Sequence, residues 1–302
     1  QGGCRSSGNP TGEDREGGLW VGFRGHGVVR LQRSLFAVYD TAHGLPSDST
    51  SVVFEGRDGV IWMGAGSGLS ALEDGTLTSF GARDGLPDRP VSAVTEDDAG
   101  RLWVGTEAGL FVSASPVRCA AGRCATHFVA VGGHPALRDH IRVLRAHAGA
   151  MLVGTNSIGV LAVPLTASSP VTQVVDGEIR AMARESTDRL WVGTRDLGLL
   201  LGTPGGVTRF TTADGLPHIT VQSLHIGVDG TLWIGTRRGL AWRRDGRMAA
   251  ITMAQGLHQN HVYGVTSDGV GRLWLTSGNG ISTATPPSST ATRASEPMPS
   301  SA

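Results

Sequence analysis

A short motif recurs seven times along this chain at nearly constant spacing. Most copies have a large apolar residue, then Val, Ile or Met, then a glycine and a small residue; the last copy, Trp274-Leu275-Thr276-Ser277, departs from this pattern. The anchors stand 42, 41, 49, 39, 42 and 41 residues apart, and they are Trp20, Trp62, Trp103, Leu152, Trp191, Trp233 and Trp274. Repeats of about 40 to 45 residues are typical of propeller blades. Repetition on this scale favours a repeat architecture over a single irregular core.

Each unit contains the pattern of several short strands. In the third unit, Val91–Asp98 alternates apolar and polar residues, Gly100–Thr106 carries the anchor, and Gly109–Val112 follows. A fourth run comes next in most units, for example Leu77–Phe80. Period-two runs bounded by Gly and Asp are typical of strands and hairpins. The first strand is expected to begin twelve residues before the anchor, at Thr50, Val91, Ile179, Val221 and Val262.

Four strands per unit predict one blade each, because a lone four-stranded sheet buries neither face and must stack on its neighbours. The predicted fold is therefore all-β, a seven-bladed β-propeller of four-stranded blades with incomplete terminal blades. We place the propeller at residues 17–284, after a poorly ordered segment 1–16 and before a disordered Pro/Ser/Thr-rich tail 285–302. Arg5–Gly12 makes a poor inner strand, and the last unit stops before an outermost strand.

The fourth unit departs most from the pattern. Leu152 replaces the tryptophan, and Val112–Gly133 carries additional residues, so we interpret this unit as a blade with a hairpin insertion. The insertion holds Cys119 and Cys124, five residues apart. A hairpin disulfide could join them, and free thiols are the main alternative, because Cys-x4-Cys is not by itself a zinc half-site. A disulfide would indicate an oxidising compartment.

Composition narrows the function classes. The 45 glycines suit many tight turns, and the formal net charge of zero argues against a nucleic-acid surface. No stretch of 18 apolar residues is present, so we expect no membrane span. There is no initiating Met and no apolar signal region, so we expect a processed form or a piece of a longer protein; Cys4 only faintly resembles a lipoprotein cysteine.

The residues also carry a family resemblance. Gly85-Leu86-Pro87, the Val91 run, Leu102–Thr106 and Gly109-Leu110 together look like the two-component regulator propeller repeat, and the resemblance covers roughly residues 17–284. It implies an extracytoplasmic sensor domain of a bacterial signalling protein, periplasmic or extracellular, which binds a ligand such as a glycan fragment. The histidine kinase or diguanylate cyclase module that would follow is absent from this chain. The resemblance implies no cofactor and no metal.

The candidate binding face follows from blade geometry. Loops leading into inner strands and loops joining second to third strands lie at the same end of a propeller, so polar side chains from several blades converge there. The candidate ligand-binding residues are Arg24, His26, Glu107, Arg142, Asn156, Arg180, Arg195, Asp196, Gln222, Arg237, Arg238, Tyr263 and Asn279. The arginines favour an anionic ligand such as a uronic acid or sulfated sugar, whereas polar loop tips are also simply solvated. The anchor tryptophans are interpreted as packing residues.

Two other functions stay open. A protein-interaction propeller would need no small ligand. A propeller lyase or hydrolase acting on a polysaccharide or lactone would use histidines such as His258 and His261, or His134, His140 and His147. No nucleophile motif such as Gly-x-Ser-x-Gly and no His-Glu-x-x-His is present, so we expect no catalytic residues.

Overall fold

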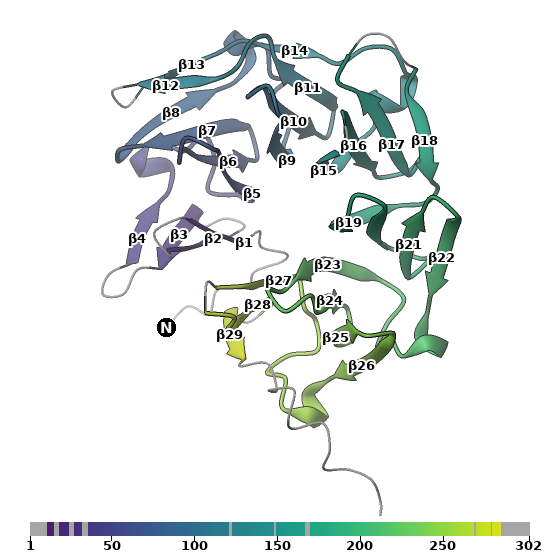
Figure 1. Ribbon diagram of the computed structural model, residues 1–302. Coiled ribbons are helices and arrows are strands. Elements are labelled where there is room, and N and C mark those ends of the chain that lie inside the picture. The colour runs from purple at the N-terminus through teal and green to yellow at the C-terminus, as the bar shows by residue number, and fades with distance from the viewer. Residues whose placement is uncertain are drawn as a thin grey trace, which may run out of the picture.

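The computed structural model describes residues 11–14, 18–23, 27–31, 36–120, 123–147, 149–166, 170–268, 270–278 and 280–284. Its strands form seven antiparallel sheets arranged in a ring around a central channel (Figure 1). In this part of the chain six sheets have four strands and the last has three. The prediction of an all-β, seven-bladed propeller is confirmed. None of the helices in these ranges has the length and hydropathy of a membrane-spanning segment.

The strands run outward from the channel in chain order. The inner strands are β1 (Thr11–Glu13), β5 (Thr50–Glu55), β9 (Val91–Glu96), β15 (Ile141–His147), β19 (Ile179–Ser186), β23 (Val221–Ile226) and β27 (Gly264–Ser267). The second strands are β2 (Leu19–Phe23), β6 (Ile61–Ala65), β10 (Leu102–Thr106), β16 (Ala150–Thr155), β20 (Arg189–Thr194), β24 (Leu232–Thr236) and β28 (Leu273–Ser277).

The outer half of each blade follows the same order. The third strands are β3 (Gly27–Leu31), β7 (Gly68–Glu73), β11 (Gly109–Ser113), β17 (Val160–Pro164), β21 (Leu199–Thr203), β25 (Gly239–Arg244) and β29 (Gly280–Ala284). The outermost strands are β4 (Phe36–Tyr39), β8 (Thr76–Phe80), β14 (Phe128–Ala130), β18 (Thr172–Val175), β22 (Gly206–Phe210) and β26 (Arg247–Ile251). Short 3-10 helices link the blades: η1 (Thr41–His43), η2 (Ala82–Asp84), η3 (Pro135–Arg138), η4 (Thr212–Asp214) and η5 (Met253–Gln255).

The first and last blades meet in the ring. The first sheet begins earlier than expected, because β1 pairs with β2 with Thr11 opposite Val21. It is a three-residue strand, and residues 1–10 and 15–17 lie outside the described ranges, as does the tail 285–302. β1 packs against β27, so the first and last sheets are neighbours and the ring closes. The last sheet has no fourth strand within the described residues, in line with the prediction.

The inserted hairpin lies in the third blade, not in the fourth as the sequence suggested. Strands β12 (Arg118–Ala120) and β13 (Arg123–Ala125) form it between β11 and β14 of the third sheet. The anchor spacing suggested the fourth blade because the insertion lies between Trp103 of the third unit and Leu152 of the fourth, and it lengthens that interval to 49 residues. A disulfide joins Cys119 and Cys124 in the structure, one of the two states that the sequence left open, and these two residues face each other across the hairpin. Cys124 is buried beside Phe80 and Phe128, so the hairpin covers the core between the second and third blades.

The glycine of the anchor motif allows neighbouring blades to approach closely. A Cβ atom on Gly105 would lie 2.6 Å from Ile141 Cγ2, and one on Gly154 would lie 2.7 Å from Ile179 Cγ2. For Gly105 the nearest obstacle is the first residue of the next inner strand; for Gly154 it is that residue together with Val143 of its own blade, whose Cγ1 would lie 2.5 Å away. The repeated glycine therefore marks where one blade packs against the next blade's inner strand.

Five of the six anchor tryptophans are buried and Trp274 is half-buried, in line with the predicted packing role, and four of the six donate the same kind of hydrogen bond. Trp103 Nε1 donates to Asp97 Oδ2 at 2.9 Å, six residues earlier. The same bond joins Trp20 to Asp14, Trp191 to Glu185 and Trp274 to Asp268. The acidic turn before the anchor thus supplies an acceptor for the indole N–H, which a buried tryptophan needs.

Candidate functional site

A β-bulge recurs near the start of the inner strands. In β15, Ile141 lies opposite Thr155 and Val143 opposite Gly154, which leaves Arg142 without a partner on β16. The same irregularity leaves one unpaired residue in each of four other inner strands, and these residues are Ser51, Ser92, Arg180 and Gln222. Bulges redirect side chains and are frequent beside functional sites. Here they turn one side chain toward the channel in each of these five blades.

These side chains line two connected hollows. One is a channel cavity of about 410 Å³ between the inner strands, and the other is a cavity of about 590 Å³ at the channel mouth. Both are lined by Ser51, Ser92, Arg142, Arg180, Gln222 and Tyr263. We use the name channel mouth for the 590 Å³ cavity, whose other lining residues are Ser49, Gly66, Pro90, Glu107, His140, Arg237 and His261.

Loops of both predicted kinds build the mouth. The backbone N–H of Glu107 donates to Pro90, and that of Asn156 donates to His140, so each second-to-third loop is bonded to the loop leading into its own inner strand. The two loop sets therefore lie at the same end of the ring, as blade geometry predicted.

Six of the thirteen candidate residues come together at the mouth. They are Glu107, Arg142, Arg180, Gln222, Arg237 and Tyr263. Four others do not line it, namely Asn156, Arg195, Asp196 and Arg238. Arg24, His26 and Asn279 lie outside the described residues. The bulge side chains Ser51 and Ser92 were not among the candidates, although both stand eleven residues before an anchor, as Arg180, Gln222 and Tyr263 do.

Residues just outside the mouth hold its arginines in place. Asn156 Oδ1 accepts hydrogen bonds from Nε and Nη2 of Arg142, at 3.0 and 2.7 Å. Glu178 pairs with Arg180 at 2.6 Å and with Arg195 at 3.1 Å. The side-chain amide of Asn156 fixes the orientation of the Arg142 fork. Arg180 is largely neutralised, whereas no ion pair involves Arg237 in the described part of the chain.

Another part of the mouth is formed by two aromatic side chains, His261 and Tyr263, and the side-chain amide of Gln222. His261 and Tyr263 have ring centroids 4.1 Å apart, and His261 Nε2 lies 3.2 Å from Gln222 Nε2. Both histidines of the mouth have a lowered pKa. Burial is the main cause; Arg142 adds to it for His140, against Glu107 and Asp139, and Arg237 adds to it for His261. Both are therefore neutral at pH 7 and can accept or donate hydrogen bonds there.

Two buried polar atoms at the mouth have no hydrogen-bond partner within the described ranges. They are Nε2 of His140 and Nε of Arg180. Buried polar groups are nearly always satisfied, so unsatisfied ones at a cavity wall indicate atoms that a bound molecule would complete. With Arg142 and Arg237, these atoms make the mouth suited to a polar, negatively charged ligand.

The lowered histidine pKa values predict a first loss of stability in mild acid. His140, His218, His225 and His261 all have a pKa below 6.5, chiefly because of burial. As pH falls through 6.5 the unfolded chain binds protons that the folded chain does not, so the free energy of unfolding decreases until the folded pKa values are reached. Thermal midpoints measured from pH 8 to pH 5 should decline, and a flat profile there would contradict this.

The acidic turns predict a second loss at lower pH. Burial raises the pKa of Asp97, but hydrogen bonds from Trp103 and Arg101 outweigh it, so its pKa lies below 3.8. The same holds for Asp14 and Asp268. Their contribution is fully present above pH 3.8 and disappears as pH falls through the folded pKa values. The thermal midpoint should drop again below about pH 4.

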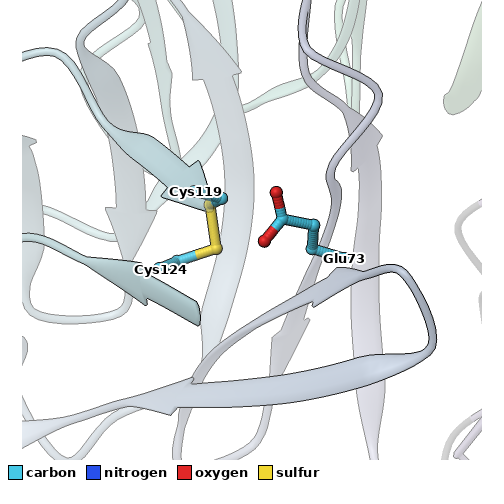
Figure 2. A group of neighbouring side chains, drawn as sticks. All are labelled: Glu73, Cys119 and Cys124. Carbon is cyan, nitrogen blue, oxygen red and sulfur yellow. A yellow bond between two sulfur atoms is a disulfide. The ribbon is translucent and has the colours of Figure 1, made fainter. Parts of the chain in front are cut away.

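Glu73, Cys119 and Cys124 are side chains of the kinds that bind metal ions, and they lie together away from the channel. Glu73 points its carboxylate toward the Cys119–Cys124 disulfide, with their candidate ligand atoms within 4.8 Å of one another (Figure 2). Both sulfurs are joined in the disulfide, so neither is a thiolate that could bind a metal ion. Glu73 Oε2 is buried and has no hydrogen-bond partner among the described residues.

The sequence profile of the family described as two component regulator propeller matches residues 85–108. These residues span the Gly85-Leu86-Pro87 turn, β9 and β10, which were among the segments that carried the resemblance, so this chain contains a repeat of that kind. No curated protein sequence matches the chain.

Several solved structures are similar to the whole ring. The extracellular domain of the hybrid two component system BT3049 from B. thetaiotaomicron superposes with a TM-score of 0.79 at 20% identity, covering 94% of this chain and 39% of that chain. The corresponding domain of BT4673 from the same organism gives 0.69 at 17% identity, covering 93% and 38%. This chain thus spans well under half the length of those two domains.

A second kind of structure has the same architecture and a similar length. A catalytically inactive variant of virginiamycin B lyase from Staphylococcus aureus, crystallised with quinupristin, gives a TM-score of 0.71 at 12% identity, covering 93% of this chain and 95% of that chain. At such low identities, all three likenesses show the fold alone.

Proposed function

We propose that this chain, which carries a two-component regulator propeller repeat in a seven-bladed ring, is a non-catalytic sensor propeller. It recognises a small polar, negatively charged ligand, such as an acidic glycan fragment, at the channel mouth. Binding would be reported to a signalling module. The observation that carries the proposal is the ring of bulge residues, which turns side chains from several blades into one hollow.

The chemistry of the mouth supports an acidic ligand. Arg142 is oriented by a neutral amide, and Arg237 has no ion pair within the described ranges, so the guanidinium group of Arg237 can pair with carboxylate or sulfate beside the fixed fork of Arg142. His140 Nε2 and Arg180 Nε lack partners. Glu107 is the one acidic residue in the mouth lining, so positive charge dominates there.

An extracytoplasmic location is part of the same proposal. The Cys119–Cys124 disulfide is typical of an oxidising compartment. Two solved structures with this fold are described as extracellular domains of hybrid two component systems. A histidine kinase or diguanylate cyclase elsewhere in the same protein would then be the partner that receives the signal.

The test uses paired oligosaccharides of equal length, one acidic and one neutral, such as an oligogalacturonate and a galacto-oligosaccharide. An acidic ligand at 100 times its dissociation constant adds about 2.7 kcal/mol to the free energy of unfolding. At about 2 °C per kcal/mol, the thermal midpoint should rise by about 5 °C. The neutral partner should give no shift.

Two adjacent arginines provide the matched variants. Arg237 lines the mouth and Arg238 does not, although both are exposed. Arg237→Ala should abolish the shift while leaving the ligand-free midpoint unchanged within about 1 °C, because it removes no buried contact. Arg238→Ala should keep the full shift. Equal shifts in the two variants would place the ligand elsewhere, and no shift with any sugar would favour a protein-interaction propeller.

A lyase is the second candidate, and two observations favour it. The propeller fold of virginiamycin B lyase covers nearly all of this chain, and two neutral histidines, His140 and His261, face the same mouth. A lyase should convert a fraction of the acidic oligosaccharide to a shorter product. Complete recovery of intact ligand after long incubation would exclude this function for the sugars tested.

A further inference from the structure

The channel below the mouth has an unbalanced charge. Among the residues that the structure describes, twenty from six inner strands and their approaches line its cavity; they include three arginines, Arg142, Arg145 and Arg180, and no aspartate or glutamate. Charged groups enclosed by protein are normally paired, because desolvation otherwise destabilises the folded state. The acidic partner of Arg180 is Glu178, which does not line this cavity. A counter-charge for Arg145 is therefore the question that the cavity raises.

Arg145 lies farther along its inner strand from the mouth than the bulge residues Arg142 and Arg180 lie along theirs. It stands three residues beyond the bulge residue Arg142, and its Nε donates to the backbone carbonyl of Met182 on β19 at 3.1 Å. This bond fixes the plane of the guanidinium and uses one of its five N–H donors. The structure shows no ion pair to Arg145 within the residues it describes.

The setting of Arg145 is both wet and enclosed. Arg145 is exposed, and it lines the channel cavity. Even so, burial lowers its pKa, and no carboxylate opposes this effect. The two observations agree if channel water reaches the guanidinium while the blades around it exclude bulk solvent. Under such conditions a charge is poorly screened and attracts a counter-ion more strongly than on an open surface.

Other polar groups in or beside the channel can donate hydrogen bonds. Ser223 Oγ and Arg180 Nε are buried and have no partner within the described ranges. His225 lies near enough for Arg145 to lower its pKa, after the larger effect of burial, and its Nε2 lies 2.7 Å from Ser267 Oγ. The described lining therefore offers hydrogen-bond donors and positive charge, and no negative group.

We propose that Arg145 is the centre of an oxyanion site inside the channel, distinct from the sugar contacts at the mouth. The group bound is a sulfate, phosphate or carboxylate, which matches the planar N–H fork of arginine. It can be a free inorganic ion or the acidic group of the ligand proposed above. Only this second source rests on the proposed function.

The experiment titrates inorganic sulfate into the intact chain by calorimetry at low ionic strength, with chloride in parallel. The expected result is one sulfate per chain, bound at least tenfold more tightly than chloride. Arg145→Gln should weaken sulfate binding at least tenfold, and Arg145→Lys should restore part of it. Equal affinities for sulfate and chloride, or an unchanged affinity in Arg145→Gln, would overturn the proposal.

Arg209→Gln is the matched control. Arg209 on β22 also donates Nε to a backbone carbonyl, that of Leu197, but on the exposed outer side of a blade. It should bind sulfate like the unaltered protein. The thermal midpoint in sulfate-free buffer separates a binding role from a structural one. Arg145→Gln should melt at or above the unaltered protein, because it removes an uncompensated charge, whereas a clear decrease would mark Arg145 as structural and overturn the proposal.

Competition distinguishes the two sources of the oxyanion. If sulfate displaces the acidic oligosaccharide, and Arg145→Gln weakens both, the acidic group of the ligand occupies the channel. If sulfate binds without displacing the sugar, the channel holds a free ion. Sulfate binding that persists when no sugar binds at all would refute the proposed glycan sensor and leave the oxyanion site standing.

Discussion

Replacing Gly105 with alanine should lower the free energy of unfolding by about 3 kcal/mol or more. The new Cβ would lie 2.6 Å from Ile141 Cγ2 and 2.9 Å from Ile141 Cβ. Cβ is fixed to the backbone, so the clash cannot be relieved by rotating a side chain, and the two blades must separate. At about 2 °C per kcal/mol the midpoint should fall by about 6 °C or more in a thermal melt.

A control glycine and a double variant make this result specific. Gly132 is exposed, and a Cβ there would meet no atom within 4 Å, so Gly132→Ala should leave the midpoint nearly unchanged. Ile141→Ala should itself destabilise, because it leaves a cavity. The combined Gly105→Ala and Ile141→Ala protein should be more stable than the sum of the two losses predicts. Strict additivity would mean that the two residues do not clash.

Replacing Asp97 with alanine should cost about 3 to 5 kcal/mol, or roughly 6 to 10 °C in the midpoint. Its side chain is fully buried, at 0% exposure, and Oδ2 accepts from Arg101 Nε at 2.8 Å and from Trp103 Nε1 at 2.9 Å. Its Oδ1 accepts from the backbone N–H groups of Ala99 and Arg101. Alanine leaves all four donors without an acceptor at the base of the third blade.

The neighbouring residue tests whether burial causes the effect. Asp98 is 88% exposed and pairs only with the exposed Arg57, so Asp98→Ala should change the free energy of unfolding by less than about 0.5 kcal/mol. Chemical denaturation of both variants gives the comparison directly. Similar losses in the two would mean that the charge of the turn matters, not the buried network around Trp103.

Much of the fold could be predicted from the spacing of residues. The anchor period predicted seven blades, and the offset of twelve residues located the starts of β5, β9, β19 and β23. The inner strand β1 was not predicted, since its Thr-Gly-Glu sequence has little strand propensity and is held by pairing with β2. The inserted hairpin was predicted, but in the wrong blade, because an anchor marks only the second strand of its unit.

The site was harder to predict because the side chains at loop tips and bulges differ from blade to blade. Polar residues at loop tips were easily found, yet Arg195, Asp196 and Arg238 do not line the mouth. The serines among the bulge residues, and Arg145, gave no chemical signal in the sequence. Ser51 and Ser92 stand at the same distance before an anchor as Arg180, but only the register of the sheets shows that this position is a bulge. Only the closed ring shows that Arg145 lacks an acidic neighbour among the described residues of the channel.

The bulges have an evolutionary consequence. A bulge residue pairs with no residue on the second strand, so its identity affects the ladder of its blade little. Five such positions already hold serine, arginine and glutamine. Selection can therefore exchange these side chains one at a time while glycines and tryptophans elsewhere keep the blades intact. The ring separates the residues that determine folding from those free to diversify, so that new specificities can arise on an unchanged architecture.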